Sequence, residues 1–294
     1  MAKGGKFIRG TAPLRSACVA MTLASVLLSL GNTCAAGSPA ASSTKQTRDE
    51  AVQAIPFDKL TPALRGKVQN TISKCSIFRR MPVQVTDCDP DMYEFFTRHP
   101  EVVVNIWETM GVSKITLQRT GENTFLADDG SGTRGTMHVM RIAHDLIVAY
   151  CDGSYDGPLV EHPLKASCVL VLRYGYVRET NGRYYMTSRL DTFIHIDSVG
   201  VELLAKTFSP LITKTSDYNF VETCAFVGNV SRTSETNPQA IARIAQRLRD
   251  VDDETRNEFT TISSRIAEKA TTNNGDRLAS TASHSARAAK SRTR

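Results

Sequence analysis

The clearest hydrophobic pattern in the chain is a pair of long strand-like segments followed by an apolar stretch with helical spacing. Lys165–Arg178 and Arg183–Ile196 are rich in β-branched and aromatic residues, and Asn181-Gly182 lies between them. Asn-Gly is typical of the two-residue type I′ turn. The pattern therefore predicts a long antiparallel hairpin in which Arg173 pairs with Leu190.

Because side chains alternate across a strand, this register predicts two faces. The more aliphatic face is assigned to the core, and it contains Val169, Val171, Arg173, Gly175 and Val177 with Met186, Ser188, Leu190, Thr192, Ile194 and Ile196. A buried guanidinium needs an anionic partner. Arg173 is therefore a candidate cationic anchor for a ligand, with Ser188 and Thr192 as polar neighbours; the alternatives are a wrong register or an Arg173 that extends to a rim.

An apolar helix is predicted directly after the hairpin. Asp197-Ser198 is a good N-cap pair, and Val201, Leu204, Phe208 and Leu211 follow at helical spacing. Pro210 should kink or break the helix, and Ser216-Asp217 can cap a second segment. The apolar stripe has to lie across the sheet, so Val201, Leu204 and Phe208 are expected to line the ligand site.

The preceding part of the chain predicts short elements in a simple order. It gives a weak helical pattern over Glu50–Lys74, a strand over Ile77–Val85 in which Pro82 indicates an edge or a bulge, and a helix over Met92–Met110 that His99-Pro100 divides. Strand-like runs follow at Lys114–Arg119, Thr124–Ala127, Thr133–Ala143 and Leu146–Tyr155. Asn237-Pro238 begins another helix after the long apolar one.

This order of elements resembles the START-like helix-grip superfamily, also called the polyketide cyclase/dehydrase and lipid transport group. The resemblance covers about Ser76–Arg232 and rests on element order. It implies an α+β helix-grip fold, in which a curved antiparallel sheet of about six to seven strands wraps around a long C-terminal helix and leaves an apolar cavity. The superfamily has no shared catalytic signature, so the resemblance implies no catalytic residue.

The two ends of the chain differ in composition from its body. Residues 1–36 have a basic start, a short apolar run (Cys18–Leu30) and small residues at Cys34-Ala35-Ala36, which is typical of a cleaved signal peptide. An uncleaved membrane anchor is the alternative. A linker and N-terminal helix (37–75), the START-like domain (76–232), a charged helical segment (233–270) and a disordered basic tail (271–294) complete the predicted organisation. The formal charge of +6 arises from the two ends, so it does not indicate a nucleic-acid-binding domain.

The residues that commonly carry chemistry show no diagnostic spacing. The cysteines form no CxxC and the histidines no HExxH, so neither a metal site nor a cofactor is predicted. Asp152–Gly157 imitates the start of a calcium loop, but the twelfth position is Pro163, and an ordinary turn is the simpler interpretation. A hairpin loop centred between Leu159 and Val160 would place Cys151 opposite Cys168, and exported protein could oxidise this pair to a disulfide.

These patterns lead to three hypotheses about function. The first is an exported, periplasmic or secreted carrier that holds a hydrophobic or anionic amphiphilic small molecule between sheet and helix. The second is a cyclase- or hydrolase-type enzyme that uses the same cavity. The third is a structural or interaction protein with a filled core, in which the charged C-terminal arm does the binding. In any of these roles, the basic tail is a candidate for contact with a membrane surface.

Overall fold

The computed structural model describes residues 40–197, 200 and 203–291. The protein is α+β, as predicted, and its centre is an antiparallel sheet in the order β1-β8-β7-β6-β5-β4-β3, with β2 also paired to β8. The strands are β1 (Ile77–Arg80), β2 (Gln84–Asp87), β3 (Thr116–Gly121), β4 (Thr124–Asp128), β5 (Thr133–Ala143), β6 (Leu146–Tyr155), β7 (Leu164–Arg178) and β8 (Tyr184–Ile196).

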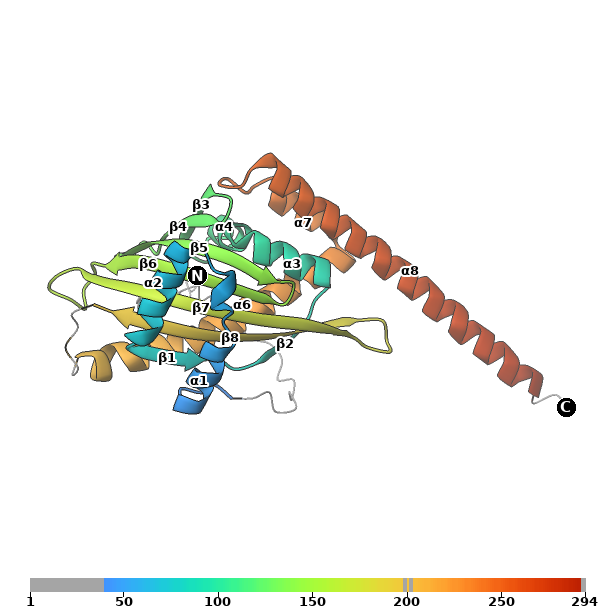
Figure 1. Ribbon diagram of the computed structural model, residues 1–294. Helices are drawn as coiled ribbons and strands as arrows, with labels where there is room; N and C mark the ends of the chain where they lie inside the picture. Colours follow the sequence, from blue (N-terminus) through green and yellow to red (C-terminus); the bar gives the residue numbers. More distant parts are fainter. Residues whose placement is uncertain (1–39, 198–199, 201–202, 292–294) are drawn as a thin grey trace, which may run out of the picture.

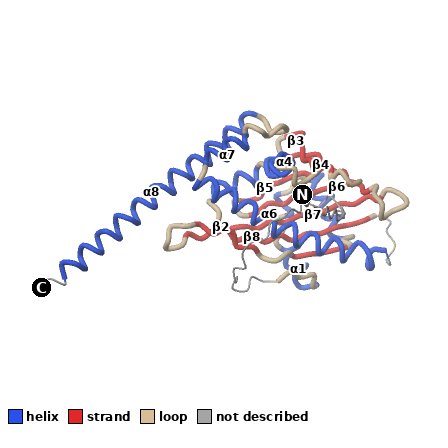
Figure 2. The backbone as a smooth tube through the Cα atoms, turned by 180° about the vertical axis from the view of Figure 1, so that it is seen from behind, coloured by secondary structure: helices blue, strands red, loops and turns tan. Residues whose placement is uncertain are grey.

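Helices cover both faces of this sheet. The outer face lies under α1 (Lys45–Gln53) and α2 (Pro62–Ser73), which are in front in Figure 1, with the short η1 (Phe57–Lys59) between them. The inner face packs against α3 (Pro90–Arg98), α4 (Pro100–Thr109), η2 (Leu204–Phe208) and α6 (Ser209–Thr236). Figure 2, seen from behind, shows α6 lying across the sheet. A helix thus closes the inner face, as the helix-grip arrangement requires.

Two helices follow α6 at the C-terminal end. They are α7 (Pro238–Ala245), capped by Asn237 as predicted, and α8 (Asp253–Ser291), which projects well beyond the sheet in Figure 1. The predicted disorder from Thr271 differs from the structure, where the helix continues to Ser291 in a segment without proline. No helix in the described ranges is both long and apolar enough to cross a membrane.

The predicted register of the β7–β8 hairpin was wrong by one residue. Arg173 pairs with Arg189 instead of Leu190. The backbone amide of Glu179 donates to Arg183 at 2.8 Å, and Gly182 has a φ of 83°, so the loop contains three residues. A three-residue loop with one left-handed glycine is the next common hairpin connection after the two-residue turn.

A pair of glycines bends the sheet around α6. Gly135 on β5 lies opposite Gly153 on β6, and both belong to the inner face. A Cβ atom on Gly153 would lie 2.3 Å from the carbonyl oxygen of Arg134, and one on Gly135 would lie 2.7 Å from that of Asp152. Only residues without a side chain permit this close approach, which is how glycine marks sharp bends in strands.

Most local predictions on the inner side were confirmed. The His99-Pro100 step separates α3 from α4, and Pro82 lies at the edge of the sheet, where the single strand predicted over Ile77–Val85 is divided into β1 and β2. At Pro210, where a kink or a break was predicted, the π-helical η2 passes directly into α6, so the helix changes its type there and does not break. The predicted break at Ser216-Asp217 was wrong. Instead, α6 runs through this point, where the Ser216 hydroxyl donates to the carbonyl of Ile212 within the helix and Asp217 forms an ion pair with Arg79 of β1.

Candidate functional site

A cavity of about 310 Å³ lies between the inner face of the sheet and α6. Side chains from β3 to β8, α3, α4, η2 and α6 form its wall, and most are apolar. They include Phe96, Val103, Ile115, Leu117, Met137, Val139, Ile147, Ala149, Leu164, Leu170, Leu172, Leu190, Ile194, Phe208, Ile212, Phe220 and Val227. Ligand pockets in proteins have volumes of about 300–1,000 Å³ and mainly apolar walls. The cavity therefore has room for one small hydrophobic molecule.

The polar side chains of the wall lie in two places, on α6 and on the paired ends of β5 and β6. Ser216 and Asn219 line the cavity one helical turn apart and are only 2% and 3% exposed. Thr223 follows one turn later, and its hydroxyl donates to the backbone oxygen of Asn219 at 2.7 Å. Across the cavity, Thr133 at the start of β5 is also buried, and its hydroxyl oxygen has no hydrogen-bond partner in the described part of the chain.

Tyr93 of α3, which lines the cavity, packs against the buried Tyr174 of β7. The Tyr93 hydroxyl of α3 lies 2.7 Å from the hydroxyl of Ser188 on β8, and its ring packs on Tyr174 with 5.0 Å between centroids. Burial raises the pKa of Tyr93 far above its ordinary value, so the phenol is neutral. This pair fixes α3 against the sheet.

The charged residues of the cavity wall direct their side chains outward. The lining includes two, Arg134 and Asp152, whose side chains are 80% and 42% exposed. Arg134 pairs with Asp128, and Asp152 lies 3.6 Å from Lys67. Among the described residues, therefore, no buried charge faces the interior of the cavity.

The cysteines of the wall are protonated thiols at neutral pH. Burial raises the pKa of Cys151 and that of Cys224 to about 12 each, and both line the cavity. Cys151 lies opposite Cys168 as the predicted register required, but both thiols are free, so the predicted disulfide is not formed. Because the thiolate is the reactive form, these groups act as small apolar side chains.

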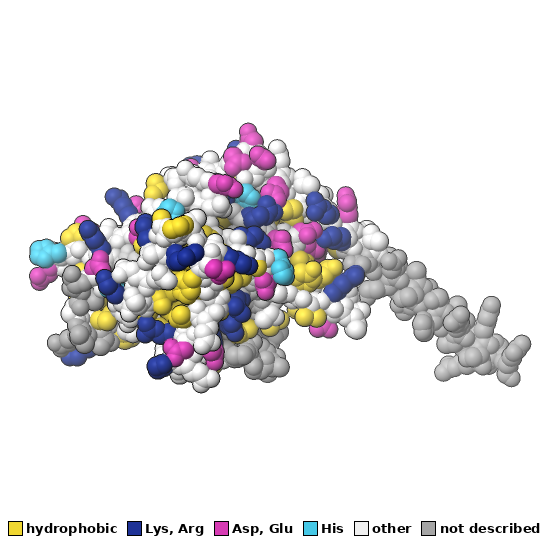
Figure 3. All heavy atoms as spheres, in the orientation of Figure 1, with side chains coloured by type: hydrophobic (Ala, Val, Ile, Leu, Met, Phe, Trp, Pro, Cys, Tyr) yellow, Lys and Arg dark blue, Asp and Glu magenta, His cyan; other side chains and the backbone are white. Residues whose placement is uncertain are grey.

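Arg173, the predicted ligand anchor, lies on the opposite side of the sheet. It is exposed on the outer face, where its guanidinium is 3.4 Å from the backbone oxygen of Ala54. The same face holds the buried Asp191, which Arg80 binds through two nitrogens at 2.6 and 3.1 Å. Figure 3 shows this face with charged side chains of both signs around a central apolar area. Arg173 therefore cannot contact a ligand in the cavity.

The other predicted site residues divide into three groups. Phe208 lines the cavity and Leu204 packs against the same apolar cluster, whereas Val201 lies outside the described residues. Ser188 and Thr192 are fully buried, and neither is among the residues that line the cavity. Sequence reasoning missed Ser216 because it was assigned with Asp217 to a helix cap, and it did not single out Asn219. The available signal was the helical spacing of polar residues within an apolar helix. Asn219 follows Ser216 by three positions, and Thr223 follows Asn219 by four.

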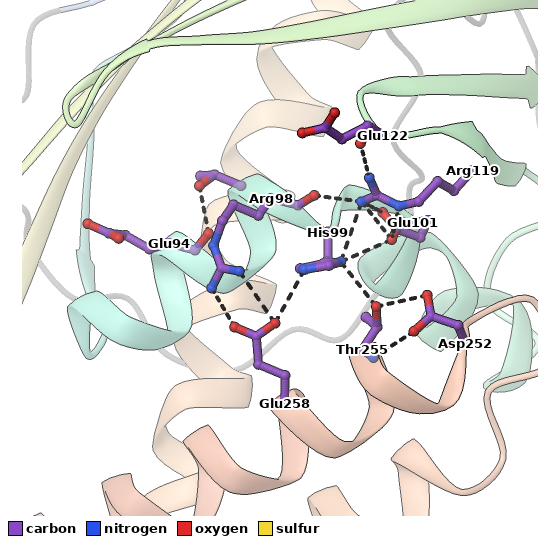
Figure 4. Close-up of polar contacts among 10 residues, drawn as sticks. Glu94, Arg98, His99, Glu101, Arg119, Glu122, Asp252, Thr255 and Glu258 are labelled. Carbon is purple, nitrogen blue, oxygen red and sulfur yellow. Dashed lines mark hydrogen bonds and ion pairs between the residues drawn. The ribbon is translucent and has the colours of Figure 1, made fainter.

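A second polar cluster lies at the junction of α3 and α4, away from the cavity lining (Figure 4). Glu101 is buried and accepts hydrogen bonds from Arg119 at 2.9 and 3.0 Å, while His99 lies 3.2 Å from it and 3.4 Å from Glu258 of α8. Arg98 adds a second contact with Glu258 at 2.6 Å. These contacts attach the start of α8 to the domain. The described residues contain no cluster of three or more His, Cys, Asp or Glu that could hold a metal ion.

Comparisons with known proteins give no assignment for this chain. No family model matches it, and no curated protein matches it in sequence. Among solved structures, a conserved protein from Geobacillus kaustophilus matches 51% of this chain and 93% of its own, with 10% identity and a TM-score of 0.34. The di-domain ARO/CYC BexL from the BE-7585A biosynthetic pathway matches 63% of this chain and 60% of its own, with 16% identity and a TM-score of 0.28.

Proposed function

We propose that this protein binds a hydrophobic small molecule in the cavity between its sheet and α6. The observation that supports the proposal best is the cavity itself, with a volume of about 310 Å³ and an almost wholly apolar wall. Burying apolar ligand surface contributes about 25 cal/mol per Å² of area removed from water. Such a wall can hold a ligand without any charged contact.

The chemistry of the cavity favours binding over catalysis. Its thiols have raised pKa values, and its charged lining residues point outward, so no observation supports a nucleophile or a general base there. We also propose that the protein is exported before it meets its ligand. The support is the basic start and the apolar run over Cys18–Leu30.

Native mass spectrometry of protein purified from an exported fraction tests both proposals together. We expect a co-purified small molecule that dissociates on denaturation, and a polypeptide mass that corresponds to a chain beginning near Gly37. A fluorescent neutral probe, N-phenylnaphthylamine, should bind the emptied protein. Ala149→Phe should abolish probe binding because it fills the cavity, whereas Arg173→Met on the outer face should leave binding unchanged. Equal binding by the Phe variant would contradict the cavity as the site.

A further inference from the structure

Two arginines on the outer face of the sheet lie directly opposite each other. Arg173 of β7 pairs with Arg189 of β8 in the ladder between the two strands. Like charges at directly opposite positions of antiparallel strands destabilise the pairing. Arg173 is exposed, and its guanidinium contacts the backbone oxygen of Ala54 at 3.4 Å, a neutral acceptor. The two cations therefore need an anion, and the carboxylates of this face are the first candidates.

These carboxylates are already bound by a third arginine. Arg80 of β1 binds both oxygens of the buried Asp191, at 2.6 and 3.1 Å, and it binds Glu50 of α1 at 2.8 Å. Arg189 approaches Asp191 to 4.0 Å, at the limit of an ion pair. On this part of the outer face, three arginines meet two carboxylates, so one positive charge is left over.

Arg189 shows most clearly that an interaction is unmet. Its side chain is 35% exposed, but its Nε atom is buried and has no hydrogen-bond partner among the residues that the structure describes. Burial, followed by the charge of Arg80 and then that of Arg173, lowers the pKa of Arg189 below its ordinary value. An arginine keeps its charge in proteins. Its surroundings therefore disfavour a charge that it cannot lose, and an external anion would relieve the cost.

The surface beside the two arginines is open. The next pair of residues on the same face is Gly175 with Thr187. Thr187 is exposed, and nothing lies within 4 Å of the position that a Cβ atom on Gly175 would take. A small anion can therefore approach the arginine pair from solvent, and the Thr187 hydroxyl offers a further donor.

We propose that Arg173 and Arg189 bind a phosphate group on the outer face of the sheet, at a site separate from the cavity. Arginine binds phosphate through two parallel N–H donors. A carboxylate has its two oxygens in one plane and suits a single guanidinium, whereas the tetrahedral oxygens of a phosphate can accept from two. Free phosphate and the phosphate of a lipid head group share this chemistry.

Titration calorimetry with inorganic phosphate is the first arm of the test, with acetate at the same ionic strength for comparison. We expect phosphate to bind more tightly than acetate. Arg173→Gln and Arg189→Gln should each weaken phosphate binding about tenfold, because a hydrogen bond to a charged group is lost. Arg232→Gln is the control, since it removes an exposed arginine that Asp87 already binds at 2.8 Å, and it should leave the affinity unchanged.

Flotation with phosphatidylcholine vesicles, with and without phosphatidic acid, is the second arm. Binding to phosphatidic acid that both arginine variants lose assigns the site to a lipid head group. Calorimetric binding of phosphate without vesicle binding assigns it to free phosphate. Binding of N-phenylnaphthylamine should be the same in all these proteins, because the sheet separates the site from the cavity. A failure of this proposal is thus distinguishable from a failure of the proposed function.

Thermal unfolding separates a binding role of Arg189 from a structural one. Without phosphate, Arg189→Gln should be at least as stable as the wild type, because it removes a charge that Arg80 and Arg173 repel. Saturating phosphate should raise the unfolding temperature of the wild type more than that of the variant. The proposal is wrong if neither arm gives binding that depends on both arginines, if acetate binds more tightly than phosphate, or if Arg232→Gln weakens binding equally.

Discussion

At the scale of single residues, Asp252 shows how one carboxylate fixes the beginning of a helix. Its side chain accepts hydrogen bonds from the backbone amide of Thr255 at 2.7 Å and from the Thr255 hydroxyl at 3.0 Å. These bonds, first of all the backbone one, lower the pKa of Asp252 below its ordinary value. The ionised form is the one that caps α8, so the contribution depends on pH.

We predict that Asp252→Ala lowers the free energy of unfolding by about 1 kcal/mol at pH 7, the usual cost of losing a helix cap. Because the folded pKa is lowered, the stabilisation is complete above the unfolded value of about 3.9 and disappears as the pH falls through the folded pKa. Urea unfolding at pH 7 and at about pH 2.5 measures the difference. Asp252→Asn is the control, because Asn also caps helices and should retain most of the stability at pH 7. A cost for Ala that stays the same at both pH values would contradict this account.

The error over Arg173 also belongs to this scale. An Asn-Gly pair fits both a two-residue and a three-residue hairpin loop, and the choice shifts the pairing of β7 and β8 by one residue. In addition, β7 is buried on both faces along its first half, with Val169 and Val171 under the outer helices and Leu170 and Leu172 toward the cavity. A strand with apolar residues on both faces has no alternation from which to assign the core side.

At the scale of elements, the sequence predicted where helices and strands begin and end more reliably than it predicted which side chains of different elements come into contact. Long strands such as β5 and β6 could be bounded because turn residues flank them, and Pro100 divided its segment as expected. The Ser216-Asp217 pair was assigned to a cap because both residue types favour helix starts. Only the fold reveals that Arg79 comes within ion-pair distance of Asp217, since the two are far apart in the sequence.

The glycine bend between β5 and β6 gives a prediction for an element. Gly153→Ala places a methyl group 2.3 Å from the Arg134 carbonyl oxygen, so the strands must move apart. We expect a loss of about 1–3 kcal/mol in the free energy of unfolding, which is typical of overpacking, together with weaker probe binding because the sheet flattens around the cavity. Gly175→Ala on β7 is the matched control, since nothing lies within 4 Å of the position that its methyl group would take. Equal effects of the two variants on stability and on binding would show that the glycine pair does not shape the cavity.

At the scale of the whole molecule, the sheet is a shared wall between two layers. The outer helices α1 and α2 pack on one side, and the cavity with α6 lies on the other. Sequence reasoning predicted the inner layer through its apolar helix, but it recognised only a weak helical pattern in the outer one. The weak pattern has a physical origin, because α1 carries many charged and polar residues and buries only Ala51.

The last helix divides into a packed part and a projecting part. Phe259, Ile262 and Ile266 of α8 are buried in the same core cluster as α3, α4 and α6, and the Phe259 ring stacks on Phe95 with 5.3 Å between centroids. Beyond Thr272 the helix continues away from the sheet to Ser291 (Figure 1). The two parts should therefore contribute very differently to stability.

We predict that a chain ending at Thr272 has the same unfolding temperature and probe affinity as the full chain, because it retains every core contact of α8 described above. Phe259→Ala in the full chain should instead cost about 3–5 kcal/mol, since it removes a fully buried ring and leaves a cavity beside Phe95. Thermal and urea unfolding of the two proteins provide the measurement. If the shortened chain were destabilised as much as the Phe259 variant, the projecting part of α8 would have to pack against the domain, and the helix would have to fold back from its position in Figure 1.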